Sequence, residues 1–241
     1  MKTSYYIRDK IDRLPKGYVF TYIDFITDVN RREAVIKYLN RMVASGEINK
    51  LSKGKYYKAE KSVFGDLPVE QYQIVKDLLE KNGKTIGYLT GYGYYNSIGL
   101  TTQVSNIIQI GKNEVRLALK RGRFKISFIK QKNTITKQNI PLLRLLDTIR
   151  YIKRIPDAPI DTSCYRLLVL LKELGEKERR LLIKLALKYP PMTRALLGAL
   201  LEQLKISQDL GNLKRSLNPI TAYKLLVSEK ILPTTKNWNI R

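Results

Sequence analysis

Residues 30–59 read NRREAVIKYLNRMVASGEINKLSKGKYYKA, and this stretch decides the fold of the N-terminal part of the chain. Its first half repeats apolar residues at helical spacing, with Asn30 as the helix cap and Glu33 at the capping-box position. Gly46 then ends the helix, and two short runs around the turn Ser52-Lys53-Gly54 predict a β-hairpin. The residues expected to face the core from this helix are Ala34, Val35, Tyr38, Leu39, Met42 and Val43.

Two shorter helices are expected before this stretch. Ile7 and Ile11 stand at helical spacing, and the turn signal Pro15-Lys16-Gly17 follows them. Thr21 is suited to cap a short second helix. Three helices followed by a hairpin, all within residues 1–62, resemble a winged helix-turn-helix domain. In such a domain the third helix lies in the major groove of DNA, and the hairpin forms the wing.

The face of the third helix that points away from the core has side chains suited to reading DNA. Arginine pairs bidentately with guanine, asparagine pairs with adenine, and lysine neutralises phosphates. The alternative is a solvated helix face beside a lysine-rich hairpin, since charges on edge strands also protect against aggregation. The side chains expected to contact DNA are Thr21, Tyr22, Arg31, Arg32, Lys37, Asn40, Arg41, Lys50, Lys53 and Lys55.

The charge of the chain favours a polyanionic partner. Its 241 residues include 45 Lys and Arg against 21 Asp and Glu, which gives a formal net charge of +24. Nucleic acid is the usual partner of so basic a protein, although a generally basic surface is the alternative. The basic residues are spread over the whole chain, so the charge does not indicate which part binds.

Several classes of enzyme and metal site are excluded by composition. The chain has no histidine, which removes the Ser-His-Asp triad and imidazole metal ligands. The single Cys164 cannot form an internal disulfide or a cysteine zinc cluster. No phosphate-binding glycine loop and no closely spaced aspartate pair for magnesium occurs. We therefore expect a binding protein without catalytic activity, cofactor or metal.

The sequence predicts a cytoplasmic protein. Its first residues mix acids and bases and contain no apolar core of a signal peptide. No apolar run approaches the roughly 18 residues needed to cross a membrane.

The middle of the chain is rich in glycine and tyrosine, and residues 85–116 read TIGYLTGYGYYNSIGLTTQVSNIIQIGKNEVR. A short helix is expected over residues 89–98, and strands over 104–110 and 125–130. The GxGxxN run at residues 91–96 follows no clear strand, so it is not read as a dinucleotide-binding loop. The tyrosines are expected to pack with satisfied hydroxyls and not to stack on bases.

This stretch resembles the type IV toxin–antitoxin antitoxin family, the AbiEi-like group. The resemblance covers roughly residues 4–130. It implies a protein that binds double-stranded operator DNA, represses its own operon and counteracts a nucleotidyltransferase-like toxin without a stable complex. The residues that match the family are Gly87, Tyr88, Gly91, Tyr94, Tyr95, Gly99, Leu100, Thr101, Thr102 and Gln103.

The remainder reads as helical, with leucine-rich stripes that predict a bundle. The expected fold class is α+β and mostly helical. It comprises a winged helix-turn-helix over residues 1–62, a small mixed α/β antitoxin domain over 63–135 and a helical domain over 136–241. The expected helices of the last part span residues 140–152, 163–174, 176–189, 193–204 and 219–228.

A second basic surface is also expected, with a solvated strand edge as its alternative. Its residues are Arg116, Lys120, Arg121, Arg123 and Lys125. Three other functions stay open: a stand-alone winged-helix regulator, an RNA-binding protein and an interaction scaffold. A helix-turn-helix reads few base pairs, so a dimer or two copies on an inverted repeat are expected.

Overall fold

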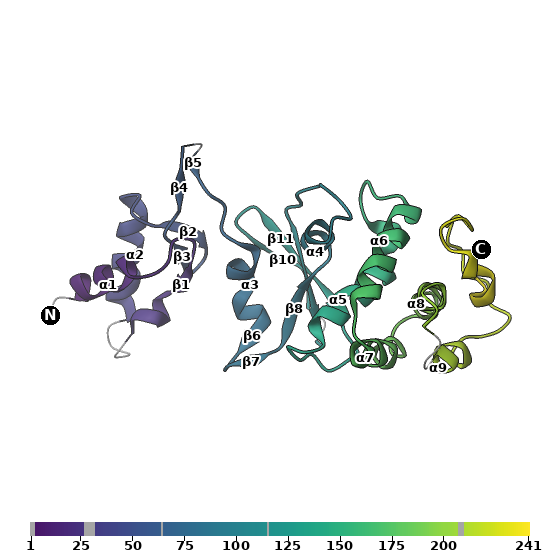
Figure 1. The fold of residues 1–241 in the computed structure, drawn as a ribbon. Helices are drawn as coiled ribbons and strands as arrows, with labels where there is room; N and C mark the ends of the chain where they lie inside the picture. Colours follow the sequence, from purple (N-terminus) through teal and green to yellow (C-terminus); the bar gives the residue numbers. More distant parts are fainter. Residues whose placement is uncertain (1–2, 27–31, 64, 115, 207–209) are drawn as a thin grey trace. The chain divides into compact units, whose positions relative to one another are not determined.

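The computed structural model describes residues 3–26, 32–63, 65–114, 116–206 and 210–241. The chain is a mixed α+β protein with several small sheets and many helices (Figure 1). It divides into two compact units. The N-terminal unit comprises residues 1–78 and 119–125, and the C-terminal unit comprises residues 79–118 and 126–241.

This division differs from the three domains expected from the sequence. The middle section does not form a unit of its own. Its first helix and the hairpin around Gly122 belong to the N-terminal unit. Its tyrosines Tyr88 and Tyr95 belong to the same hydrophobic core as the C-terminal helices.

The N-terminal unit contains helices and a hairpin near the predicted positions, together with one strand, β1, that the sequence did not predict. Helix α1 (Thr3–Asp12) leads to strand β1 (Val19–Thr21), the 3-10 helix η1 (Tyr22–Phe25) and helix α2 (Arg32–Ala44). Strands β2 (Asn49–Ser52) and β3 (Lys55–Tyr57) follow, and β3 pairs antiparallel with both β1 and β2. The expected cap Asn30 lies outside the described residues. The buried core of this unit comprises Ile7, Ile11, Phe20, Phe25, Val35, Leu39, Met42, Ile48 and Tyr56.

Helix α2 ends where the sequence predicts, and its inward face differs at one position. Gly46 has a φ of +74°, the left-handed conformation that glycine adopts after a helix. Val35, Leu39 and Met42 are buried as expected, whereas Ala34 is exposed. Residue 34 precedes the first buried position by one, and a rotation of about 100° per residue places it outside the core-facing stripe.

The N-terminal unit also contains a helix and two small hairpins. Strands β4 (Lys61–Ser62) and β5 (Gly65–Asp66) pair with each other ahead of helix α3 (Gln71–Leu79). Ile74, Val75 and Leu78 of α3 are buried, as the sequence predicts. Strand β10 (Leu119–Arg121) pairs with the start of β11 (Phe124–Lys130).

The sheet of the C-terminal unit places a strand where the sequence predicts a helix. After the small β6 (Glu80–Lys81) and β7 (Lys84–Thr85) pair comes β8 (Gly87–Thr90), and then helix α4 (Tyr92–Ser97). Strand β8 pairs antiparallel with β9 (Ile107–Lys112), which lies between β8 and β11. The start of the expected helix at 89 was therefore wrong, because residues 87–90 are held by the ladder to β9.

The glycine run after β8 is a packing feature. Strand β8 ends directly before Gly91, so the expectation that residues 91–96 follow no clear strand was wrong. Gly91 has a φ of +72°, and a Cβ atom there would overlap the side-chain amide of Gln109. The space beside the backbone of Gly91 is thus occupied by a protein side chain, and helix α4 has only six residues.

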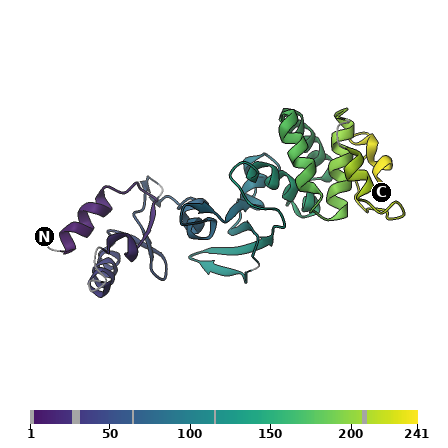
Figure 2. The same ribbon diagram turned by 90° about the horizontal axis from the view of Figure 1, so that it is seen from below.

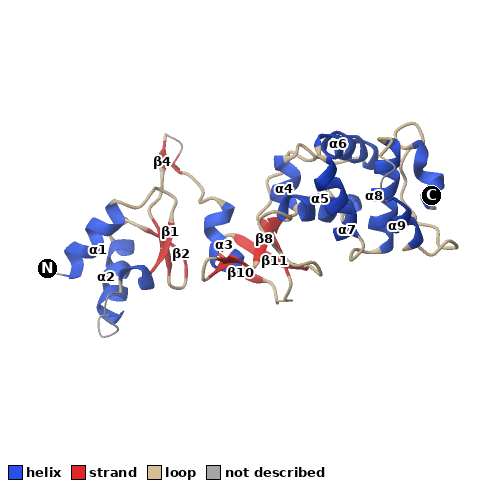
Figure 3. Cartoon of the chain, turned by 60° about the horizontal axis from the view of Figure 1, so that its bottom comes forward, coloured by secondary structure: helices blue, strands red, loops and turns tan. Residues whose placement is uncertain are grey.

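Helices fill the rest of the C-terminal unit, and α8 lies at their centre (Figures 2 and 3). It contacts α5, α6, α7, α9 and the 3-10 helix η4. Residues 195–201 of α8 are all buried, so this helix has no solvent face along that run. None of the helices in the described ranges is long and apolar enough to cross a bilayer. The helices are α5 (Ile140–Arg150), η3 (Ile152–Arg154), α6 (Ile160–Glu173), α7 (Glu176–Ala186), α8 (Pro191–Gln203), α9 (Leu210–Arg215) and η4 (Pro233–Trp238).

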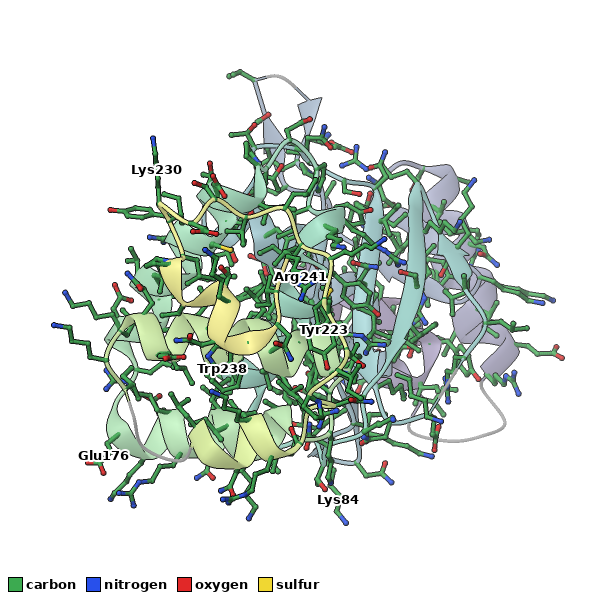
Figure 4. The ribbon with its side chains drawn as sticks, turned by 90° about the vertical axis from the view of Figure 1, so that its right-hand side faces the viewer. Lys84, Glu176, Tyr223, Lys230, Trp238 and Arg241 are labelled. Carbon is green, nitrogen blue, oxygen red and sulfur yellow. The ribbon has the colours of Figure 1, made fainter. Side chains whose placement is uncertain are left out.

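The helix expected over residues 219–228 is absent. The backbone N–H of Tyr223 donates to the carbonyl of Asn239, and the N–H of Arg241 donates to the carbonyl of Tyr223. This segment is therefore extended along the C-terminus, as Figure 4 shows with Tyr223 and Arg241 labelled. Trp238, also labelled there, packs where a Cβ on Gly198 of α8 would stand.

A buried polar network lies where the helices meet the sheet of the C-terminal unit. Asp147 of α5 is fully buried and accepts hydrogen bonds from the hydroxyls of Tyr88 (2.7 Å), Tyr189 (3.0 Å) and Thr90 (3.1 Å). The side-chain amide of Gln131 donates to both tyrosine hydroxyls, at 2.9 and 2.8 Å. Burial raises the pKa of Asp147 to about 6, although these hydroxyls lower it.

Candidate nucleic-acid interface

The exposed face of α2 presents cations that have no acidic partner among the described residues. Lys37 and Arg41 are exposed, and the Arg41 guanidinium lies 5.5 Å from the Tyr38 ring centroid. Arg32 lies 5.0 Å from the ring centroid of half-buried Tyr22, at the edge of this face. None of these three cations forms an ion pair within the described ranges, so no acidic side chain there neutralises their charge. The predicted contact Arg31 lies outside the described residues.

Two predicted contacts have local structural roles. The Thr21 hydroxyl accepts a hydrogen bond from the N–H of Ile23, and the Asp24 carboxylate accepts one from the backbone N–H of Thr21 at 2.6 Å, which completes a capping box. Asn40 is exposed, but its amide oxygen accepts a hydrogen bond from Tyr56 at 3.1 Å. Bidentate reading of adenine needs both the oxygen and the nitrogen of the amide. Thr21 therefore caps η1, and one of the two lone pairs of the Asn40 amide oxygen is occupied by Tyr56.

The hairpin contributes two free lysines and not three. Lys50 and Lys53 are exposed and make no ion pair within the described part of the chain. The side chain of Lys55 is only 17% exposed, and its ammonium lies 3.0 Å from the carboxylate of Asp77 on α3. In this geometry a contact between Lys55 and a DNA phosphate would require the ion pair with Asp77 to break.

Asp77 joins three elements of the N-terminal unit. Its two carboxylate oxygens accept from the Arg121 guanidinium at 2.5 and 2.8 Å, and Arg121 also donates to the carbonyl of Ile74. Burial raises the pKa of Asp77, but the hydrogen bonds from Arg121 and Lys55 outweigh it, so the pKa lies below its ordinary value. The cluster ties α3, β3 and β10 together.

Replacing Asp77 with alanine should destabilise the N-terminal unit. The Arg121 side chain, only 9% exposed, would be left without its carboxylate partner, at a cost of about 1–3 kcal/mol for a buried donor. Urea unfolding of the full chain checks this. Asp12→Ala is the matched control, because Asp12 pairs with Lys58 at an exposed site and should cost at most about 1 kcal/mol. Equal destabilisation by the two variants would contradict the structural role of Asp77.

The second basic surface is smaller than expected. Arg121 is buried against Asp77, so it is not part of that surface. Lys120, Arg123 and Lys125 are exposed on the hairpin of the N-terminal unit. Arg116 is exposed as well, and its guanidinium lies 3.9 Å from the Glu114 carboxylate. Three cations of the five thus remain together on one hairpin.

The residues that match the antitoxin family mostly have structural roles. Tyr88 and Tyr95 are buried in the core, as the packing interpretation of the tyrosines predicts. Gly99 ends α4, and the N–H of Leu100 donates back to the carbonyl of Tyr95. The side-chain amide of Gln103 donates to Asp157.

One basic cluster was missed by the sequence reasoning. Its residues come from β11 and the loop after it, from α5, from the connection between α7 and α8 and from α8 itself, and they line one cavity of the C-terminal unit. The alternation of Lys130 and Lys132 about buried Gln131 is the one local signal. The other members are 20 to 64 residues from Lys130 along the chain, so no spacing rule links them. The cations of the cluster are Lys130, Lys132, Arg150, Lys188 and Arg194.

Comparison with known proteins places the chain in a family and finds a solved structure with a similar fold. The crystal structure of the RV2827C protein from Mycobacterium tuberculosis matches 92% of this chain and 84% of its own, with a TM-score of 0.52 and 12% identity. At that identity the likeness concerns the fold alone. No curated protein matches the sequence. The model of DUF6088, a family of unknown function, matches residues 6–179. The chain therefore belongs to the family DUF6088.

Proposed function

We propose that the chain is a cytoplasmic antitoxin that binds operator DNA through a winged helix and represses its own operon. It acts by binding and not by catalysis. The observation that carries the proposal is a set of four cations of the N-terminal unit, Lys37 and Arg41 of α2 and Lys50 and Lys53 of the hairpin. These four cations are exposed and without acidic partners among the described residues.

The order of the elements supports the winged-helix assignment. Helix α2 follows η1 and precedes the β2–β3 hairpin, in the position of the helix that enters the major groove. The three-stranded sheet has the order β1-β3-β2, so β2 is an edge strand and the hairpin turn at Lys53 is accessible. Basic side chains on the helix and on the hairpin of one unit allow base contacts and phosphate contacts to be made together.

The wing should contribute affinity that is independent of DNA sequence. Replacing Lys50 and Lys53 with alanine should weaken binding to every duplex alike. It should also reduce the salt slope of log K by about one for each phosphate that is no longer neutralised. Fluorescence anisotropy at several salt concentrations measures both quantities. The control removes two lysines of the C-terminal unit, Lys84 and Lys177, and leaves the wing intact. Loss of sequence preference with an unchanged salt slope would contradict the role of the wing.

The antitoxin activity rests on the resemblance of residues 4–130 to the AbiEi-like group. We infer that the functional partner is a nucleotidyltransferase-like toxin and that direct contact with it is not required. A toxin gene beside this gene separates an antitoxin from a stand-alone regulator. Expressing that toxin should stop growth, and co-expressing this chain from an unrelated promoter should restore it. Failure to restore growth would contradict the antitoxin proposal and leave DNA binding unaffected.

A single α2 helix reads few base pairs, so we expect two copies on an inverted repeat. Footprinting of the upstream region checks this expectation. Two protected half-sites about one helical turn apart would support it, and one protected stretch shorter than a turn would contradict it.

A further inference from the structure

The C-terminal unit contains a cavity of about 540 Å³ whose charged lining is entirely cationic among the described residues. Five basic side chains, the missed cluster named above, come from β11, the loop after it, α5, the α7–α8 connection and α8. No carboxylate is among the described residues that line it. Cavities of this size hold drug-sized and nucleotide-sized molecules, whereas a single inorganic phosphate fills a small part of one.

The cations around the cavity are available to a ligand. Lys130, Lys132 and Lys188 are exposed and have no ion pair within the described ranges. Arg194 donates from one terminal nitrogen to the carbonyl of Ser216, and its Nε is inaccessible to solvent. Arg194 therefore contributes its positive charge to the cavity that it lines.

The cavity is also lined by fixed polar groups and by apolar side chains. Gln131 and Tyr189 line it, and both are held by hydrogen bonds of the network around Asp147. Leu187, Pro190 and Pro191 supply the apolar lining. A lining that combines apolar surface with a few fixed polar groups is typical of small-molecule sites.

A helix terminus adds to the positive potential. Pro190 is the N-cap of the 13-residue helix α8, and no side chain of the described residues caps that end. Unsatisfied N–H groups and the helix dipole at an N-terminus both favour an anion. Pro190 and Pro191, which form this helix end, line the cavity together with the cations.

We propose that this cavity binds a small polyphosphate ligand of the nucleoside di- or triphosphate class. The phosphate chain lies among the five cations, and the nucleoside lies against Leu187 and the two prolines. Such a ligand has about three or four negative charges, which balance a cluster that otherwise repels itself. The proposal is independent of DNA binding, because the cavity lies in the C-terminal unit and α2 lies in the N-terminal unit.

The test is isothermal titration calorimetry of the full chain with ATP, GTP and inorganic tripolyphosphate at about 0.15 M salt. We expect one site per chain with micromolar affinity for the nucleotides, and a rise in melting temperature on binding. The double variant Lys132→Ala/Lys188→Ala should weaken binding at least about tenfold, since it removes two exposed cations and leaves the core intact. The charge-matched control Lys84→Ala/Lys177→Ala should bind as the wild type does.

Three results would overturn the proposal. The first is no heat and no melting shift with either nucleotide at about millimolar concentration. The second is equal weakening by the control variant, which would mean attraction to the net charge alone. The third is tight binding of a single-stranded RNA without a terminal phosphate that nucleotides do not displace. If tripolyphosphate bound as tightly as ATP, the nucleoside part of the proposal would be overturned, because contact with the apolar lining would then add no affinity.

Discussion

Replacing Lys37 and Arg41 together with alanine should weaken binding of the chain to its own upstream DNA by about 2–5 kcal/mol, roughly 30-fold or more. Both side chains are exposed on α2 and form no ion pair among the described residues, so they can approach DNA without breaking a salt bridge inside the protein. A bidentate arginine–guanine pair contributes about 1–3 kcal/mol of discrimination, and a lysine adds phosphate or base contacts. Anisotropy with a labelled duplex measures the change.

A conservative variant separates base reading from charge. Arg41→Lys keeps the positive charge and removes the planar fork that fits guanine. It should bind scrambled DNA as the wild type does while losing preference for the upstream sequence. The control Lys84→Ala removes one charge from an exposed lysine of the C-terminal unit, labelled in Figure 4. Unchanged affinity of the double variant for the upstream duplex would contradict the assignment of α2 as the recognition helix.

Replacing Asp147 with alanine should destabilise the C-terminal unit by about 3–4 kcal/mol. The carboxylate accepts three hydroxyl hydrogen bonds in a fully buried site, and the variant would leave these donors without their acceptor. Urea unfolding followed by circular dichroism measures the decrease in stability. The control is Asp157→Ala, since Asp157 is exposed and its removal should cost less than about 1 kcal/mol. Equal midpoints for wild type and Asp147→Ala would contradict the network.

The same carboxylate predicts a dependence of stability on pH. Burial raises the pKa of Asp147 from 3.8 to about 6, so the folded protein binds more protons than the unfolded chain between these values. The contribution of Asp147 to the free energy of unfolding is therefore greatest at low pH and is lost as the pH rises through about 6. Relative to Asp147→Asn, the wild type should lose about 2–3 kcal/mol between about pH 4 and about pH 7. An advantage of the wild type that grows with pH would contradict the raised pKa.

Local signals predict the N-terminal unit well. The spacing of Val35, Leu39 and Met42, the glycine after α2 and the hairpin turn are all properties of a few neighbouring residues. They are the features that propensity and periodicity report. The exposure of Lys37 and Arg41 follows from the same spacing.

The predictions that failed concern residues whose contacts are made with residues distant in the sequence. Lys55 and Arg121 read as surface cations, and only the fold brings both to Asp77. Residues 219–228 have a helical composition, but the C-terminus supplies their hydrogen bonds. Strand β8 exists because β9 pairs with it, which overrides the weak helical pattern of a glycine-rich run.

Asp147 shows how a single residue can signal a buried network. It stands among leucines in residues 140–150, at a position where the helical pattern points to the core. A lone acid on an apolar face indicates a buried polar partner, but the sequence does not identify the tyrosines and the amide that meet it.

Binding of the purified full chain to its own upstream DNA tests the account most directly. The measurement is anisotropy at near-physiological salt, with scrambled duplex and a structured RNA of equal length as competitors. The account predicts that binding of the upstream sequence resists both competitors and that Lys37→Ala/Arg41→Ala abolishes this preference. Equal competition by scrambled DNA would contradict sequence-specific binding and would mean that the net charge of +24 attracts any polyanion. Stronger competition by the RNA would contradict it as well and would mean that the chain binds RNA.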